Sequence, residues 1–165
     1  MVGFKFLRRP DLLAACNKML SRTYAEIATG AKMPLTFGSP YKSYYNKVDV
    51  RQVDVPSFSG HFGILPQHVP TLAVIKPGVL SVVEMDGITK KYFVSSGSIS
   101  VNIDSSVQIL AEEACELTDL DMAACKEGLA EAQREATSAT DERAKVEGQI
   151  KVEVYEALVK AAETA

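Results

Sequence analysis

The feature that most constrains the fold is a change in the spacing of apolar residues near Leu117. Before this point, apolar and polar residues alternate in short runs, which is the period of a β-strand with one buried face. After it, apolar residues recur every three or four positions, which is the period of an α-helix. The residues from 118 to 139 are rich in Ala and Glu and nearly free of β-branched side chains, so they favour a helix as well. The chain is therefore predicted to contain an all-β part followed by a helical part.

The predicted all-β part covers residues 34–116. Its strands are short, follow one another at roughly ten-residue spacing, and are separated by Gly, Pro, Asn and Asp, which is typical of an antiparallel sandwich or barrel. Leu35–Phe37 alternates, and so do Ile99–Ile103 and Val107–Ala111. The run Ser95–Ser100 has the composition of a hairpin turn. We expect an antiparallel sandwich or barrel over these residues.

Two local signals refine this prediction. In Val48–Val55, the alternation slips by one position where Arg51 and Gln52 stand together, and one extra residue is what a β-bulge inserts. Asp86-Gly87 separates two apolar runs and predicts a tight hairpin, because glycine tolerates a positive φ.

The predicted helical part covers residues 117–165 and consists of two helices joined by Thr137–Asp141, which is long enough only to reverse the chain. Thr118 and Asp121 have the spacing of a capping pair at the first helix. Alanine-rich seams bury little apolar area, so such a hairpin needs the sheet or a partner for support. The predicted seam consists of Met122, Cys125, Leu129, Ala132 and Ala136 in the first helix, and of Val146, Ile150, Val154, Ala157 and Ala161, with Leu158 beside them, in the second.

The N-terminal residues 1–24 differ from the rest in charge. They contain five basic side chains and one acid, whereas residues 25–165 contain 13 basic and 20 acidic residues. A basic, acid-poor segment with an apolar face predicts a mitochondrial transit peptide. The alternative is an amphipathic helix that belongs to the fold. On the first interpretation, residues 25–33 form an N-terminal arm.

The bulk composition limits the function. No apolar run is long enough to span a bilayer, and a net charge of −3 gives no reason to expect nucleic acid as a partner. The three cysteines, Cys16, Cys115 and Cys125, have neither zinc-site nor C-x-x-C spacing, so they are expected to be reduced structural thiols.

The stretch Phe58–Leu72, "FSGHFGILPQHVPTL", raises the question of a chemical site, because it holds both histidines of the chain. His61 and His68 have no third ligand nearby, so packing or partner contact is the stronger interpretation. The acidic run from Glu112 to Asp121 lacks calcium-loop spacing and is interpreted as a solvated edge and a helix start. Tyr41, Tyr44 and Tyr45 fit either a ligand platform or packing at the edge of the core. No phosphate-binding or nucleophile motif is present, so we predict no catalytic residue, no metal and no cofactor.

From about Leu35 to the C-terminus, the chain resembles the delta subunits of mitochondrial ATP synthases, the counterparts of the bacterial epsilon subunits. The resemblance is carried by Gly63-Ile64-Leu65-Pro66, the histidine and proline that follow, Lys76-Pro77-Gly78 and the alanine-rich ending. It implies a ten-stranded sandwich followed by two helices in the central stalk of the complex. This stalk turns inside the catalytic head and rests on the membrane-embedded ring of proton-carrying subunits.

The resemblance also implies a role, a location and partners. The role is to join the gamma subunit to the membrane c-ring, with the small mitochondrial epsilon subunit packed beside it. The location is the matrix side of the mitochondrial inner membrane, as a peripheral part of the complex. The implied ring-facing loop is Ser57, Phe58, Ser59, Gly60, His61 and Phe62, and the implied gamma-facing residues are Ile64, Leu65, His68 and Val69.

One departure from the family pattern bears on regulation. Some bacterial relatives bind ATP through a motif that contains an arginine, and Ala124 occupies that position in Leu120–Cys125 of this chain. The cation that would meet a phosphate is absent, so we predict no useful ATP binding. Two alternatives to a purely mechanical role remain. One is a regulatory subunit of the same complex, whose helical hairpin inhibits ATP hydrolysis. The other is an independent β-sandwich protein that binds a ligand.

Overall fold

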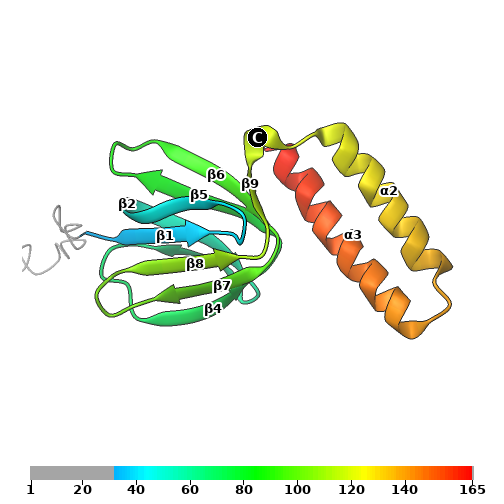
Figure 1. Cartoon of the computed structure of the whole chain (residues 1–165), viewed down its shortest axis with the longest axis horizontal. Helices are drawn as coiled ribbons and strands as arrows, with labels where there is room; N and C mark the ends of the chain where they lie inside the picture. The colour runs from blue at the N-terminus through cyan, green and yellow to red at the C-terminus, as the bar shows by residue number, and fades with distance from the viewer. Residues whose placement is uncertain (1–31, 165) are drawn as a thin grey trace, which may run out of the picture. The chain divides into compact units, whose positions relative to one another are not determined.

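The computed structural model describes residues 32–164, and two distinct architectures follow each other within them (Figure 1). The predicted fold class is confirmed: a β-sandwich is followed by a two-helix hairpin. The sandwich has nine strands in the described residues, where about ten were expected. The elements are β1 (Pro34–Gly38), β2 (Ser43–Ser57), β3 (Gly60–Ile64), β4 (Thr71–Ile75), β5 (Gly78–Glu84), β6 (Thr89–Val94), β7 (Gly97–Val101), β8 (Val107–Ala111), β9 (Ala114–Glu116), the 3-10 turn η1 (Leu117–Asp119), α2 (Met122–Ser138) and α3 (Glu142–Ala162).

The sheet closes around its core through the long strand β2. The strand order is β1-β8-β7-β4-β2-β5-β6-β9, with β3 paired to β2. Strand β1 is parallel to β8 and antiparallel to β2, so Leu35 lies between Val107 and Val48. Because β2 pairs with β1 in its first half and with β3 and β5 in its second half, it passes from one layer of the sandwich to the other.

Both local sequence signals are confirmed. The pairing of β2 with β5 shifts register between Val50 and Gln52, and this bulge lets Val50 and Val53 both point into the core. At the tip of the β5–β6 hairpin, Gly87 has a φ of 87°, and its N–H donates to the Glu84 carbonyl at 3.0 Å.

The interpretation of Ser95–Ser100 as a turn is wrong beyond its first two residues. Strand β7 begins at Gly97, and a Cβ at that position would come within 2.2 Å of the Leu110 carbonyl oxygen on β8. The glycine therefore serves the close approach of two strands, and the serines that follow it are strand residues. Ile103, which was expected in this strand, lies beyond its end at Val101 and is 89% exposed.

The sandwich core is made of aliphatic side chains and an aromatic cluster. The Phe37 ring stacks on Tyr44 with centroids 4.9 Å apart and meets Tyr92 edge-on at 5.4 Å. The Tyr44 hydroxyl donates to the Ala114 carbonyl on β9, which ties two distant strands together. The aliphatic core residues with no exposed surface include Leu35, Val50, Val53, Val55, Ile64, Ile75, Leu80, Val82, Val94, Val107 and Ala111.

The start of the helical part differs from the prediction. Thr118 belongs to a 3-10 turn that holds the buried Leu117, so it is not the first residue of a capping pair. Asp121 alone caps α2, because its carboxylate accepts a hydrogen bond from the Ala123 N–H at 2.8 Å.

The contact between α2 and α3 is also different from the predicted seam. On α2, Cys125 and Ala132 are buried, and Met122 and Leu129 are half-buried. On α3, however, Val146 is 49% exposed and Ile150 is 56% exposed, so their assignment to the seam is wrong, while Val154 is half-buried. Gly148 faces α2 in their place, where its added Cβ would come within 2.8 Å of the Ala136 Cα.

The C-terminal half of α3 packs on the sandwich. Ala161 is buried together with Phe93 of β6 and Leu117, and the cluster is completed by Val154, Ala157 and Leu158 of α3 with Val79, Cys115 and Leu120. The Lys91 ammonium donates to the Thr164 carbonyl at 3.2 Å beyond the end of the helix. The hairpin therefore obtains from the sheet the support that its sequence predicted it would need.

The remaining predictions concern membrane spans, metal sites, cysteines and the N-terminal residues. Between residues 32 and 164, no helix combines the length and the apolar character needed to cross a bilayer. In the same range, no three His, Cys, Asp or Glu side chains are grouped so that they could hold a metal ion. Cys115 and Cys125 are free thiols. The predicted transit peptide, most of the arm and Cys16 lie outside the described residues.

Candidate functional site: an exposed turn and an apolar sheet face

The first candidate surface is the tight turn between β2 and β3. Ser57 pairs with Gly60, so Phe58 and Ser59 form the tip. Gly60 has a φ of 123°, a conformation that residues with a side chain rarely adopt. The tip exposes an aromatic ring, since Phe58 is 71% exposed. A large apolar side chain displayed on a rigid turn is typical of a residue that anchors a partner.

The residues predicted to face the ring differ in how exposed they are. Phe58, Ser59 and His61 are exposed, and Gly60 is half-buried. Phe62 leans against the sandwich core. Ser57 is only 1% exposed, so the structure contradicts its assignment as a direct contact residue. It lies inside the turn because its hydroxyl satisfies backbone and side-chain groups there.

The residues predicted to face gamma are also divided. Ile64 has no exposed surface and pairs with Val53 inside the sheet, so its assignment to a partner surface is wrong. Leu65 is 41% and Val69 69% exposed, so both are accessible. His68 is half-buried: its ring lies 6.4 Å from the Phe62 ring, and its Nδ1 is 2.8 Å from the Val69 carbonyl oxygen. The contact between His68 and Phe62 therefore links the predicted gamma-facing residues to the predicted ring-facing residues.

The second candidate surface lies on the outer side of strands β4, β7 and β8. On the outer side of β4, Leu72 is 80% exposed and Val74 is 58% exposed. They pair with Ser100 and Ser98 on β7, and Ser98 pairs in turn with Leu110 on β8, which is 63% exposed. We call Leu72, Val74, Ser98, Ser100 and Leu110 the β4–β8 face. Its small serines separate larger apolar side chains, so it is hollowed.

The hollow extends toward β1. A depression of about 520 Å³ is lined by ten residues, among them Thr36, Gly38, Ser98, Ser100 and Leu110. Its lining offers hydroxyl groups and apolar surface but no acid, base or cation, so it suits the side chains of another protein better than the chemistry of a substrate.

The turn and the β4–β8 face are adjacent. Ser57 pairs with Ile75 at the end of β4, and the Phe58 N–H lies 3.4 Å from the Val74 carbonyl oxygen. Phe58, Val74 and Leu72 therefore follow one another along one border of the sandwich. An exposed apolar area of this kind on a folded domain marks a protein interface.

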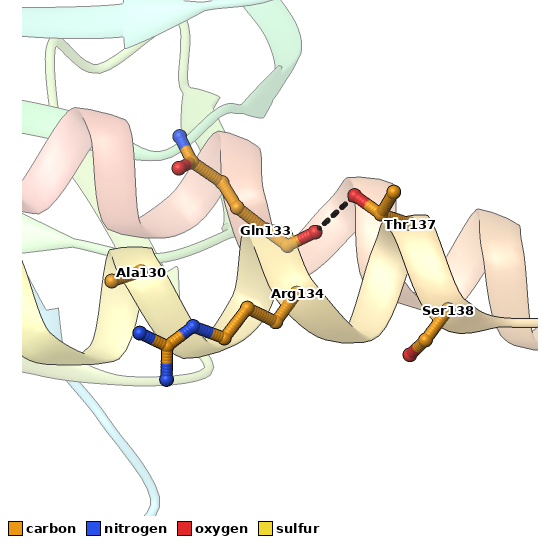
Figure 2. Close-up of a pocket in the computed structure, with 5 residues that line it drawn as sticks. All are labelled: Ala130, Gln133, Arg134, Thr137 and Ser138. Carbon is orange, nitrogen blue, oxygen red and sulfur yellow. Dashed lines mark hydrogen bonds between the residues drawn. The ribbon is translucent and has the colours of Figure 1, made fainter.

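The helical hairpin offers no comparable site. Figure 2 shows a depression on α2, where Ala130, Gln133, Arg134, Thr137 and Ser138 project from one helix only. Its one internal hydrogen bond runs from the Thr137 hydroxyl to the Gln133 carbonyl at 2.6 Å. No nucleophile, base or paired charge converges there, so this depression is ordinary helix surface.

A group of three polar side chains in the sandwich, Glu84, Lys90 and Tyr45, has a structural role. Lys90 bonds the Glu84 carboxylate at 2.8 Å, and the Tyr45 hydroxyl donates to the same carboxylate at 2.9 Å. These two hydrogen bonds, that from Lys90 above all, lower the pKa of Glu84. Burial, followed by the hydrogen bonds to Tyr92 and Glu84, raises the pKa of Tyr45 above its ordinary value. Every member has a partner, so the group holds strands together and leaves no reactive side chain.

The three tyrosines considered as a ligand platform do not converge. Tyr41 is 85% exposed, Tyr44 packs on the core, and Tyr45 is buried. The interpretation as packing at the edge of the core therefore holds for Tyr44 and Tyr45.

Comparison with known proteins gives these surfaces a context. The family described as the ATP synthase delta/epsilon chain β-sandwich domain matches residues 32–117. The family of C-terminal domains of the metazoan delta subunit of F1F0-ATP synthase matches residues 120–161. The chain belongs to the ATP synthase delta/epsilon family.

Relatives along most of the chain carry the same subunit name. Mitochondrial ATP synthase subunit delta of Caenorhabditis elegans is 46% identical over 146 residues, which cover 86% of this chain and 89% of that protein. The subunit of the same name in Yarrowia lipolytica is 44% identical over 141 residues, or 86% of each chain. Both names assign these delta subunits to mitochondria.

Solved structures share the fold of this delta/epsilon chain. A chain in the cryo-EM structure of the Euglena gracilis mitochondrial ATP synthase, OSCP/F1/c-ring, aligns with a TM-score of 0.74 and 23% identity, covering 98% of this chain and 99% of that one. A chain in the central stalk/c-ring structure of the Tetrahymena thermophila mitochondrial ATP synthase aligns with a TM-score of 0.60 and 17% identity, covering 79% and 96%. At these identities, the likeness concerns the fold.

Proposed function

We propose that this chain is a non-catalytic rotor subunit of mitochondrial ATP synthase, which joins the gamma subunit to the c-ring so that ring rotation drives ATP synthesis. Its place is the matrix side of the inner membrane, with the small epsilon subunit as a further neighbour. The observation that carries the proposal is the adjacency of two exposed apolar surfaces, the Phe58 turn and the β4–β8 face, on one rigid sandwich. A subunit that transmits torque has to hold two partners at once without yielding between them.

We assign the two surfaces to different partners. The turn, with Phe58 and His61, contacts the polar loops of the c-ring. The β4–β8 face, with Leu72, Val74 and Leu110, contacts gamma, and Leu65 and Val69 extend this contact area. Ile64 and Ser57 support these surfaces from inside the sandwich and touch neither partner.

Charged substitutions in the assembled complex test the assignment. Phe58→Asp and Leu72→Asp each replace an apolar side chain at a proposed contact by a carboxylate, which would lose its water when the partner docks, at a cost in free energy. In membrane vesicles, both variants are expected to reduce the protons pumped per ATP hydrolysed. Met85→Asp is the matched control, because Met85 is 65% exposed on the β5–β6 turn, outside both surfaces. Full coupling in Phe58→Asp and Leu72→Asp would contradict the proposal.

The proposed role does not include control by nucleotide. Asp121, part of the stretch that aligns with the ATP motif of bacterial relatives, is engaged in capping α2. A swing of the hairpin that inhibits hydrolysis would expose Phe93, Leu117 and Ala161, which pack together here. Calorimetry with ATP and the full chain is expected to show no binding in the micromolar range, and micromolar affinity would favour the regulatory alternative.

A further inference from the structure

We propose that the Ser57 hydroxyl is a positioning group that holds the β2–β3 turn in the conformation that presents Phe58 to the ring. This inference rests on the proposed function, because it concerns the same turn. It assigns the buried serine a role distinct from partner contact: Ser57 acts through Phe58 and does not itself reach the partner.

The hydrogen bonds inside the turn support this role. The Ser57 Oγ donates to the Gly60 carbonyl at 2.7 Å and lies 2.9 Å from the Ser59 Oγ. A serine has a single hydroxyl hydrogen, so Ser59 is the donor in the second bond. Ser57 thus bonds to both of the turn residues that follow Phe58, and with 1% exposure its hydroxyl has almost no access to water as a substitute.

The base of the turn is fixed independently of this hydroxyl. The Lys76 N–H donates to the Pro56 carbonyl at 3.1 Å, and Pro56 is buried against Gly78, where a Cβ would come within 3.1 Å of its ring. The tip has less support, since the Phe58 N–H is 3.4 Å from the Val74 carbonyl oxygen and its ring is mostly exposed. The Ser57 hydroxyl is therefore the side-chain group that transfers the rigidity of the strands to the tip.

Rigidity at the tip matters for binding. An exposed aromatic ring that is already held in its bound conformation loses less conformational freedom when the partner docks. Without the hydroxyl, the turn would have to be ordered by the ring contact itself. The loss of one hydrogen bond of this kind is expected to weaken the contact about fivefold to tenfold.

The first arm of the test measures the tip directly. The chain contains no tryptophan, so Phe58→Trp introduces a single indole at the tip, which can be excited selectively over the six tyrosines. Time-resolved anisotropy of the full chain is expected to show faster local motion of the indole when Ser57→Ala is added. Unchanged anisotropy would overturn the proposal, because the hydroxyl would then not be ordering the tip.

The second arm measures coupling in the assembled ATP synthase with Phe58 unchanged. Ser57→Ala is expected to reduce the protons pumped per ATP hydrolysed, because the ring contact is weaker. Val55→Ala is the matched control, because Val55 is a fully buried neighbour on β2 whose truncation destabilises the sandwich without removing a bond of the turn. Equal losses in both variants would overturn the proposal and leave Ser57 a merely structural residue.

Phe58→Asp separates this inference from the proposed function. If Phe58→Asp uncouples the complex and Ser57→Ala does not, the ring contact stands and the positioning role of Ser57 is refuted. If Phe58→Asp leaves coupling intact, the ring contact itself is refuted, and the role of Ser57 in that contact falls with it.

Discussion

The sandwich and the hairpin solve the problem of burying apolar surface in opposite ways. The sandwich encloses large side chains, with Phe37, Leu35 and Ile75 fully buried among its strands. The hairpin buries almost none, and its helices approach each other closely at Gly148, where an added Cβ would meet the Ala136 backbone, and at Gly128, where it would meet the Tyr155 ring. The comparison indicates that the sandwich folds on its own core, whereas the hairpin depends on close backbone approach and on its contact with β6 and Leu117.

The largest expected effect lies in the sandwich core. Phe37→Ala removes a ring with no exposed surface that packs against Tyr44 and Tyr92. We expect the free energy of unfolding to fall by about 3–5 kcal/mol, from lost burial and the cavity that remains. Urea unfolding followed by circular dichroism measures this. A loss below about 1 kcal/mol would mean that the core collapses around the gap.

Gly148→Ala is expected to act on the hairpin alone. On an open helix surface this change stabilises by about 0.5–1 kcal/mol, but here the new Cβ would meet the Ala136 backbone at 2.8 Å. Since backbone atoms cannot turn aside, we expect a loss of about 1–3 kcal/mol. Amide hydrogen exchange should speed up in α2 and α3 and stay unchanged in the strands.

Gly128→Ala provides the matched comparison. Its Cβ would lie 2.3 Å from the Tyr155 ring, a side chain that can move, so the loss should be smaller than at Gly148. Combining Gly128→Ala with Tyr155→Leu is expected to restore slow exchange. Faster exchange in the strands as well would refute the claim that the sandwich is stable without the hairpin.

Tyr45→Phe tests the polar group that joins β2 to β5. We expect the free energy of unfolding to fall by about 1 kcal/mol near pH 7, because one hydrogen bond is lost.

The folded state lowers the pKa of Glu84 from 4.5, so the stabilisation from ionised Glu84 is present above that pH and is lost as the pH falls through the folded-state pKa. Unfolding at pH 7 and pH 3 should therefore show a smaller difference between Glu84→Gln and the unsubstituted protein at the lower pH. An equal difference at both values would contradict the role of the charge.

The smallest effect is expected at the bond between the two helices. Lys151 Nζ lies 2.6 Å from the Glu135 carboxylate, and both side chains are about half exposed. Exposed ion pairs contribute little, so Lys151→Met should leave the thermal unfolding temperature almost unchanged. A loss that exceeds that of Gly148→Ala would show that charge, and not close approach, holds the hairpin.

Features of the fold could be predicted from the sequence where one residue pattern has one physical cause. The bulge at Arg51 and Gln52 and the turn at Gly87 were readable because a slipped alternation and an Asp-Gly pair each have one physical cause. Strand β4 carries apolar residues on both sides, so the pattern alone could not tell that Leu72 and Val74 face outward while Ile75 faces inward. A contiguous apolar area that faces solvent is a sign of an interface, and it becomes visible only when burial is known.

The hairpin seam shows the second limit. Sequence reasoning placed Val146 and Ile150 in the seam from the spacing of apolar residues along the second helix, whereas the helices approach most closely at a residue without a side chain, Gly148. The site shows the same difficulty in another form. Ser57 and Ile64 lie in the segment that forms the proposed contact surfaces. A shift of one position along a turn or strand decides whether a side chain reaches a partner or supports the surface from inside the sandwich.

The central claim, that the sandwich holds two rotor partners through adjacent surfaces, is tested most directly by photocrosslinking in the intact complex. A photoreactive amino acid would replace Phe58 in one preparation and Leu72 in another, and the crosslinked chains would be identified by mass spectrometry. We predict the c-ring subunit at position 58 and the gamma subunit at position 72. Crosslinks from both positions to the same partner, or to neither of these two subunits, would contradict the claim.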